Sequence, residues 1–265
     1  MIYRANGSIV DTGSYIDYDL ICKSINHRGY NLTAPENTLP AFQLSRQMGF
    51  IYVETDVQFT SDDVAVLLHD ESINRTARNA DGTQLSSTVN IADITYEQAL
   101  TYDFGIYKNA KYAGTKIPTL AEFLTLCKNL GLRPYIELKV GTQAQIQGVV
   151  DAVRDAGLKG NETYISFDST LLGYVKSYNS HARLGLLGMP GSPSSAAALK
   201  TDYNEVFLDS NSTVVASQCK AAGVGYEVWT IGSASAVLAL DPYVTGVTTD
   251  GQIKAGQVLY DDSIS

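Results

Sequence analysis

Short apolar runs alternate with helical patterns along most of this chain, and that alternation restricts the folds open to it. Helical stretches have apolar residues three and four positions apart, and they separate most of the apolar runs. The clearest are Thr38–Met48, Leu120–Leu130, Gln143–Ala156, Ser169–Tyr178 and Ser212–Ala222. The predicted strands are Cys22–His27, Phe50–Val57, Pro134–Lys139, Thr163–Phe167, Arg183–Leu187, Glu205–Asp209, Gly225–Thr230 and Val244–Thr249.

Strands that alternate with helices are joined by crossover connections and therefore lie parallel. Eight such units in 265 residues favour an α/β fold of the TIM (β/α)8 barrel type, which typically has about 250 residues. An open doubly wound sheet is the alternative, but no GxGxxG or P-loop follows an early strand. We expect the barrel domain to span 21–265. Residues 1–20 show no periodicity and are predicted to be an N-terminal extension or linker.

The alternation is interrupted between His69 and Pro118, where the chain is polar and rich in turn residues. We interpret about 71–117 as a small insertion after the second strand, and we expect it to lie over the C-terminal mouth of the barrel. Aromatic rings offer flat apolar surfaces with a polar edge, so those of the insertion would suit a sugar or polyol chain. They include Tyr102, Phe104, Tyr107 and Tyr112.

Two predicted strands carry charged residues at alternate positions. Glu54 and Asp56 are two apart in one strand, and Glu137 and Lys139 are two apart in another. Side chains two apart share a face of a strand, so these residues point away from the apolar neighbours that pack on helices. In a parallel barrel the charged face points inward, near the carboxyl ends of the strands, where active sites lie.

Three carboxylates that converge in a barrel repel one another and lose hydration, which costs several kcal/mol or more per isolated charge. A divalent cation bound by Glu54, Asp56 and Glu137 removes this cost. Ligation by oxygen alone favours Mg²⁺ or Ca²⁺ over zinc. The alternative is a salt-bridge network in which the carboxylates pair with Arg28 and Lys139.

His27 and His69 each follow an apolar run and lie close in sequence to an acidic residue or strand. Histidine titrates near neutral pH, so a pair of histidines can take and give protons within one catalytic cycle. We predict that these two form an acid–base pair. The third histidine, His181, lies in a polar turn and is expected to be a surface residue.

Composition excludes some classes of partner. The net charge is −9 and no basic stripe is present, which argues against a nucleic-acid partner. No segment has the apolar length to span a bilayer. Because the N-terminus lacks a signal-peptide pattern, we expect a cytoplasmic protein, or a secreted one whose signal or upstream domain is absent from this sequence. Cys22, Cys127 and Cys219 are widely spaced, so free thiols are expected.

These motifs closely resemble the glycerophosphodiester phosphodiesterase family in order and rough spacing. A lone His-Arg-Gly would be weak evidence, whereas the whole series in register is specific. The matching residues are His27-Arg28-Gly29, Ala34-Pro35-Glu36-Asn37-Thr38, Ala41-Phe42, Glu54-Thr55-Asp56-Val57, His69-Asp70, Arg75-Thr76, Pro118-Thr119-Leu120, Glu137-Leu138-Lys139, Ser166-Phe167, Trp229-Thr230 and Thr249-Asp250.

The resemblance implies a TIM barrel that hydrolyses glycerophosphodiesters to an alcohol and glycerol 3-phosphate. It implies metal ligation by the three carboxylates, acid–base catalysis by His27 and His69, and phosphate binding by Arg28 and Lys139. Trp229 is either a core residue or an apolar wall against the glycerol carbons.

The chain departs from the family pattern after Trp229-Thr230, where asparagine is often found, and after Thr249-Asp250, where proline is common. Both departures concern the substrate-facing rim and therefore the leaving group. A glycerol-phosphate polymer of the teichoic-acid kind and a lysophospholipid are alternative substrates. A non-catalytic binding module is a third hypothesis, against which the complete set of histidines and carboxylates argues.

Overall fold

The computed structural model describes residues 2–3, 9–10, 23–189, 191–211, 215–241 and 243–251. Within them, eight parallel strands form one sheet, in which each strand pairs with the next along the chain. These strands are β3 (Lys23–Asn26), β4 (Tyr52–Phe59), β6 (Arg133–Leu138), β7 (Thr163–Ser166), β8 (Arg183–Gly188), β9 (Val206–Ser210), β10 (Gly225–Val228) and β11 (Val244–Thr249).

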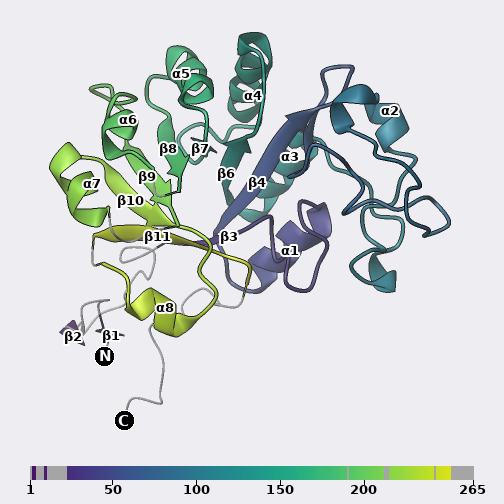
Figure 1. The fold of residues 1–265 in the computed structure, drawn as a ribbon, viewed down its shortest axis with the longest axis horizontal. Helices are drawn as coiled ribbons and strands as arrows, with labels where there is room; N and C mark the ends of the chain where they lie inside the picture. The colour runs from purple at the N-terminus through teal and green to yellow at the C-terminus, as the bar shows by residue number, and fades with distance from the viewer. Residues whose placement is uncertain are drawn as a thin grey trace.

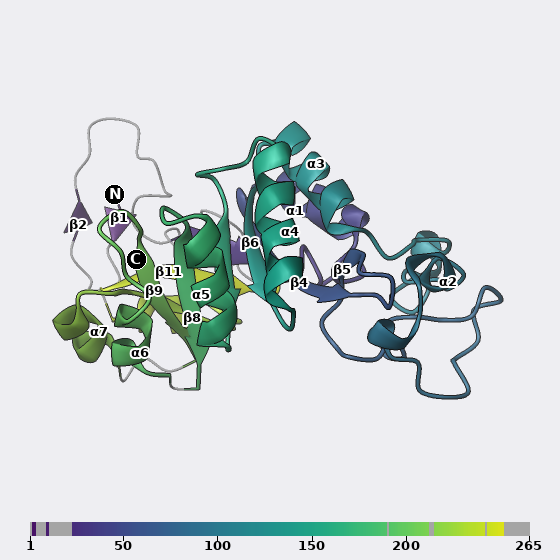
Figure 2. The ribbon, with the colours of Figure 1, turned by 90° about the horizontal axis from the view of Figure 1, so that it is seen from above.

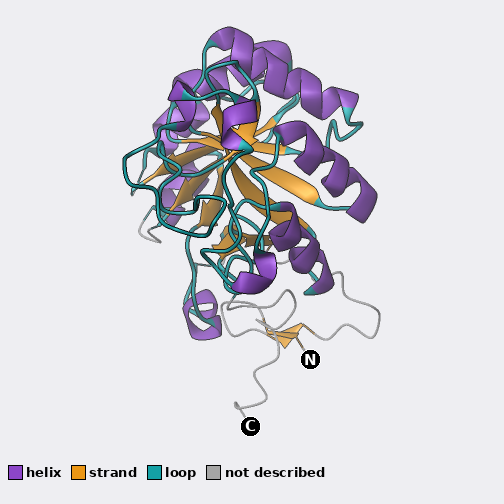
Figure 3. Ribbon diagram, turned by 90° about the vertical axis from the view of Figure 1, so that its right-hand side faces the viewer, coloured by secondary structure: helices purple, strands orange, loops and turns teal. Residues whose placement is uncertain are grey.

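The sheet closes on itself because β3 pairs with both β4 and β11. Ile25 is opposite Tyr52, and Thr248 is opposite Ile25 on the other side. Figure 3 shows the helices surrounding these strands. The prediction of a TIM barrel is confirmed, and the open doubly wound alternative is wrong.

Helices cover the outside of the barrel (Figures 1 and 2). They are α1 (Leu39–Gln47), α3 (Leu120–Leu130), α4 (Gln143–Asp155), α5 (Ser169–Tyr178), α6 (Pro193–Ala197), α7 (Ala216–Ala222) and α8 (Ala234–Leu238). Thr119 and Thr142 form capping boxes at the start of α3 and α4, and Gly131 ends α3 in the left-handed conformation. The five predicted helices are present, although 212–214 lie outside the described residues. The short helices α6 and α8 were not predicted.

The alternation within β4 and β6 divides their side chains between two environments. Val53 and Ile136 point outward into the main core and join Phe123 of α3. Glu54, Asp56 and Glu137 take the opposite face, as the sequence predicted. Strand register places Asp56 directly opposite Glu137, so the two acidic strand segments meet inside the barrel.

The amino end of the barrel interior is filled by a different set of side chains. Tyr135 and Phe207 belong to the interior apolar cluster. The Arg183 guanidinium lies 4.1 Å from the centre of the Phe207 ring and donates to Glu227 at 2.7 Å. This stacked and ion-paired layer closes the barrel at the end opposite its mouth.

An extra strand, β5 (Ala65–Leu67), pairs antiparallel with β4 and precedes the predicted insertion, about 71–117. The segment continues through η2 (Ile91–Asp93), α2 (Tyr96–Ala99) and η3 (Ala110–Tyr112). It buries its own apolar cluster, which includes Ile73, Phe104 and Ile117, together with Val66 of β5.

The insertion stands beside the barrel, as Figures 1 and 2 show, and not over its mouth as expected. The physical reason is that its apolar residues pack on one another and on β5. Phe104 is in that core, and the Tyr107 hydroxyl accepts a hydrogen bond from the Glu36 backbone N–H. The Phe104 ring is therefore not available to a sugar or polyol, and the Tyr107 hydroxyl is used within the protein.

Near the N-terminus, β1 (Ile2–Tyr3) pairs antiparallel with β2 (Ile9–Val10). The rest of the predicted extension, 1–20, lies outside the described residues, as does Cys22. Cys127 and Cys219 are buried free thiols, as expected. Among the described residues, no helix combines the length and the apolar character needed to cross a membrane.

Candidate active site

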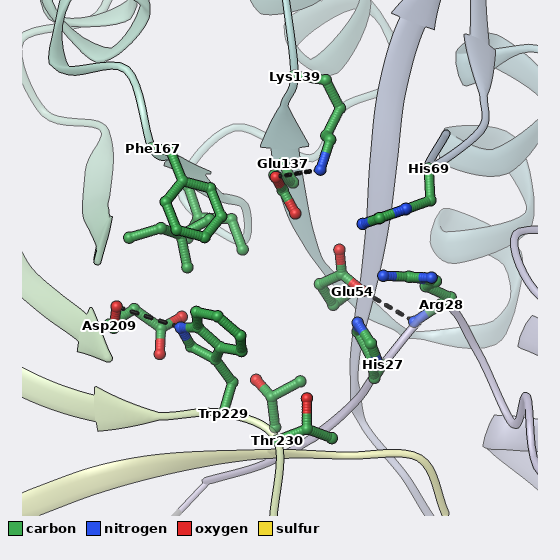
Figure 4. A pocket seen from close by; sticks show the side chains of 13 residues that line it. His27, Arg28, Glu54, His69, Glu137, Lys139, Phe167, Asp209, Trp229 and Thr230 are labelled. Carbon is green, nitrogen blue, oxygen red and sulfur yellow. Dashed lines mark hydrogen bonds and ion pairs between the residues drawn. The ribbon is translucent and has the colours of Figure 1, made fainter. Parts of the chain in front are cut away.

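A cavity of about 290 Å³ lies at the carboxyl ends of the barrel strands. Figure 4 shows two contrasting walls. His27, Arg28, His69 and Lys139 lie on one side, and Phe167 and Trp229 lie on the other. The full lining comprises His27, Arg28, Glu54, His69, Glu137, Lys139, Ile165, Phe167, Leu187, Asp209, Trp229, Thr230 and Thr248.

Three carboxylates meet at the charged wall. Glu54, Asp56 and Glu137 each offer an oxygen within 4.8 Å of the others. Their residues are 3%, 0% and 8% exposed, so water screens their repulsion poorly. Glu54 and Glu137 line the cavity, whereas Asp56, opposite Glu137 in the sheet, does not.

Backbone and amide donors hold this carboxylate triad. The Arg28 N–H donates to Glu54 Oε2 at 2.8 Å, and Asn37 Nδ2 donates to Asp56 Oδ2 at 2.8 Å. Both Arg28 and Asn37 adopt left-handed backbone conformations, with φ of 53° and 54°. Non-glycine residues rarely do so, and such positions concentrate at functional sites.

Two cationic side chains contact the triad within the described residues. Arg28 Nε lies 3.2 Å from Asp56, and Lys139 Nζ lies 2.9 Å from Glu137 and 3.7 Å from Asp56. Arg28 is shared, because its Nη1 also donates to Glu36 at 3.0 Å. The salt-bridge alternative is therefore partly realised, but it gives the Glu54 side chain no cation within ion-pair distance.

The pKa values of the three carboxyl groups are shifted in different directions. Burial, together with the charges of Asp56 and Glu137, raises the pKa of Glu54 well above its usual range. Burial and the Asp56 charge likewise raise the pKa of Glu137 to about 7. Burial acts in the same direction on Asp56, but Arg28, His69 and Lys139 overcome it and hold its pKa below the usual value.

The triad fits a divalent cation. Glu54 Oε1 and Asp56 Oδ1 are buried and make no hydrogen bond within the described part of the chain. A buried acceptor without a donor is unfavourable. A cation coordinated by these oxygens would satisfy them and would remove the repulsion that raises the pKa of Glu54 and Glu137.

His27 is the first residue after β3, and a carboxylate fixes its ring. Its Nδ1 lies 2.5 Å from Asp250 Oδ1, which also accepts from Asn31 Nδ2 at 2.8 Å. Hydrogen bonds to His27 and Asn31 outweigh burial and lower the pKa of Asp250. Because an ionised carboxylate only accepts, the proton of this bond is on Nδ1 and the Nε2 atom is left for other chemistry.

His69 is fixed in the same way on the neighbouring side. Its Nδ1 lies 2.6 Å from Asp70 Oδ1, and Arg75 Nε donates to Asp70 Oδ2 at 2.6 Å. These bonds lower the pKa of Asp70 to about 2 against the effect of burial. Burial lowers the pKa of His69, although Asp56 and Asp70 oppose it.

The opposite wall is mostly apolar. Phe167 is 49% exposed at the rim, and its ring centre lies 5.8 Å from that of Trp229 in an edge-to-face arrangement. Ile165 and Leu187 are buried deeper in the same wall. Trp229 faces the cavity while its indole N–H donates to the Asp209 carbonyl at 3.2 Å, so it is more than a core residue.

Seven of the eight residues that the sequence singled out line this cavity, and the eighth, Asp56, belongs to the carboxylate triad. His181 lies elsewhere, exposed and stacked on Tyr203 at 5.0 Å, as expected. The sequence assigned no role to Glu36, Asn37, Asp70 and Asp250, although all four belong to the quoted motifs. It missed Asp209 entirely, because a single acid at a strand end carries no motif.

Comparison with known proteins agrees with this geometry. The sequence profile of the "Glycerophosphoryl diester phosphodiesterase family" matches residues 27–252. A glycerophosphodiester phosphodiesterase of Caldanaerobacter subterraneus is 30% identical over 213 residues, which are 78% of this chain and 84% of that protein. Human glycerophosphodiester phosphodiesterase 1 is 36% identical over 118 residues, 44% of this chain but only 33% of the human protein.

Solved structures share the fold. A putative glycerophosphoryl diester phosphodiesterase from Silicibacter pomeroyi superposes with a TM-score of 0.76 at 23% identity, covering 93% of this chain and 95% of that one. A phosphodiesterase from Oleispira antarctica, in complex with the product sn-glycerol-3-phosphate, has a TM-score of 0.74 at 24% identity and covers 90% and 96%. From the profile match and the Caldanaerobacter relative, we conclude that the chain belongs to the glycerophosphoryl diester phosphodiesterase family.

Proposed function

We propose that this protein is a metal-dependent phosphodiesterase that hydrolyses glycerophosphodiesters to an alcohol and glycerol 3-phosphate. One observation carries the proposal. Three carboxylates fit a cation, and two of them share a cavity wall with two oriented histidines and two cationic side chains. Membership of the family supports the same chemistry.

Glu54, Asp56 and Glu137 would hold one divalent cation, Mg²⁺ or Ca²⁺, because hard cations prefer oxygen ligands. When bound, the ion supplies positive charge to the phosphate and lowers the pKa of a coordinated hydroxyl. The chain's own cations would add to that charge. Arg28 would donate to phosphate oxygens through the guanidinium N–H groups that Asp56 and Glu36 do not engage, and Lys139 would act as a point charge.

His27 and His69 would be the acid–base pair. One imidazole Nε2 accepts the proton of a glycerol hydroxyl while that oxygen forms a bond to phosphorus. The other imidazole gives a proton to the oxygen of the departing alcohol as its bond to phosphorus breaks. Water then opens the cyclic phosphate with the histidine roles reversed, which yields glycerol 3-phosphate. Asp250 and Asp70 support this by fixing the proton of each ring on Nδ1.

The apolar wall would bind the glycerol carbons against Trp229 and Leu187. The Oleispira phosphodiesterase was solved with sn-glycerol-3-phosphate, which supports a glycerol phosphate as the retained product here. A small glycerophosphodiester is therefore the proposed substrate. A glycerol-phosphate polymer remains the second candidate, because the rim around Phe167 is open.

A direct assay tests the proposal. Purified protein is incubated with glycerophosphocholine and with a glycerol-phosphate polymer, and glycerol 3-phosphate is measured. We expect release that a chelator abolishes and that added Mg²⁺ or Ca²⁺ restores. Release that persists in the chelator would remove the metal from the proposal, and no release from any substrate would reject the activity.

A further inference from the structure

Asp209 of β9 is a buried acid that the proposed chemistry leaves without a role. The residue is only 2% exposed, and its Oδ1 makes no hydrogen bond among the described residues. It nevertheless lines the cavity, next to Leu187 in the strand pairing and close to Trp229 (Figure 4). A buried polar group without a partner is rare in a folded protein and calls for a ligand or another explanation.

Within the described part of the chain, Asp209 forms no ion pair. The Arg183 guanidinium, whose charge acts on Asp209, is engaged by Glu227 at 2.7 Å and by Glu205 at 3.0 Å. Burial, followed by the like charge of Glu227, raises the pKa of Asp209 well above its usual range. A neutral carboxyl group can both donate and accept a hydrogen bond, and it does not repel an anionic substrate.

The depth of Asp209 in the cavity determines which part of a bound substrate can contact it. Phe167 at the rim is 49% exposed, whereas Asp209 is 2% exposed, so Asp209 lies deep in the cavity. A phosphate held by Arg28 and Lys139 lies at the charged wall. The group that extends from it along Leu187 and Trp229 ends near Asp209, away from the open rim through which the alcohol leaves.

We infer that Asp209 binds the terminal hydroxyl of the glycerol moiety, and thereby selects glycerol phosphodiesters over analogues that lack this hydroxyl. The inference rests on the proposed function. In the proposed mechanism, the hydroxyl on the carbon adjacent to the phosphorylated carbon attacks phosphorus. The terminal hydroxyl is therefore the one that is free to bind Asp209. Ile165 and Leu187 beside it have no polar side-chain atom, and the Trp229 indole N–H is already bonded to the Asp209 carbonyl, while Thr230 and Thr248 are the hydroxyl-bearing residues of the lining.

The test compares two substrates in one enzyme. The first is glycerophosphocholine, and the second is propane-1,2-diol phosphocholine, which keeps the attacking hydroxyl and lacks the terminal one. Wild type should prefer the first in kcat/KM by about 5- to 150-fold, the range for one hydrogen bond to a buried group. Asp209→Leu should bring the ratio close to one. Asp209→Asn should keep most of the preference, because an amide also donates and accepts.

Leu187→Ala is the matched control, since Leu187 lies opposite Asp209 in the sheet and makes no hydrogen bond through its side chain. It should lower kcat/KM for both substrates by the same factor. Thermal unfolding verifies that each variant is folded, and Asp209→Ala serves the same comparison if the leucine is not accommodated. Equal losses on both substrates in Asp209→Leu, or an unchanged preference, would overturn the inference while leaving the proposed function intact.

A wild type inactive on both substrates would instead reject the proposed function. In that case, the role of Asp209 is tested by calorimetry, which measures the affinity of the protein for glycerol 3-phosphate and for propane-1,2-diol phosphate. Tighter binding of glycerol 3-phosphate by wild type and not by Asp209→Leu would support a hydroxyl-binding role. Equal binding of the two ligands by wild type would overturn it.

Discussion

Arg75 of the insertion donates to both carboxylate oxygens of Glu36, from Nη1 at 2.6 Å and from Nη2 at 2.7 Å. Its Nε atom donates to Asp70, the partner of His69, while Glu36 accepts from Arg28. One guanidinium thus connects a candidate catalytic histidine to a candidate phosphate ligand. Although the insertion lines none of the cavity with its described residues, it positions two side chains that do.

Arg75→Met should therefore lower kcat, because small displacements of positioned groups reduce rates by up to about 100-fold. Lysine cannot form the bidentate contact with Glu36, so Arg75→Lys should retain only part of the wild-type kcat. The measurement is kcat and KM on glycerophosphocholine, with Arg78→Lys as the control in the same segment. Full activity in Arg75→Met would show that the contacts of Arg75 with Glu36 and Asp70 do not position the catalytic site.

His69→Ala should leave the protein folded and lower kcat by at least about 100-fold, the usual contribution of a general acid or base. His69 is half-buried at the cavity and belongs to none of the apolar clusters, so circular dichroism and thermal unfolding should change little. The matched control is His181→Ala, which removes the same side chain far from the cavity. A His69→Ala enzyme with most of the wild-type rate would exclude this residue from the mechanism.

Cation binding should be visible without any assay of activity. Mg²⁺ or Ca²⁺ at about 100 times its Kd should stabilise the wild type by about 2.7 kcal/mol. Glu54→Gln should raise the stability of the metal-free protein, because it removes repulsion within the triad, and it should weaken or abolish the response to the ion. A Glu54→Gln variant that responds like wild type would show that the ion binds elsewhere.

The contribution of Asp70 to stability should depend on pH in a defined direction. The folded-state pKa of about 2 lies below the ordinary value, 3.8. Such a carboxylate stabilises the fold above its unfolded pKa and loses that contribution as pH falls toward the folded value. The difference in unfolding free energy between wild type and Asp70→Asn should therefore be constant above about pH 5 and shrink below pH 4. A difference that grows on acidification would contradict this ion-pair network.

Local periodicity was sufficient to predict much of this molecule. The alternation of Val53 with Glu54 placed the acidic residues inside the barrel, because side-chain direction in a strand depends only on position along it. Apolar spacing in the helices likewise depends on neighbours three and four residues away. These features need no knowledge of the rest of the chain.

Features that depend on distant segments were not predictable in this way. His27 is fixed by Asp250, which is 223 residues away in sequence. The insertion lies beside the barrel because Phe104 and Ile117 pack against β5, an arrangement that no local pattern encodes. Asp209 shares the inward face of β9 with Phe207, but a single acid has no second charged residue two positions away to mark it as part of a site.

The layer of Arg183, Glu227 and Phe207 fills the amino end of the barrel, so the described residues leave the cavity open at the carboxyl ends of the strands. If the protein has the proposed activity, both products would leave through that opening. The alcohol, bound nearer the rim, would then leave before glycerol phosphate, which would act as a competitive inhibitor when it accumulates in solution. The size of the alcohol would matter little, because most of it would extend into solvent.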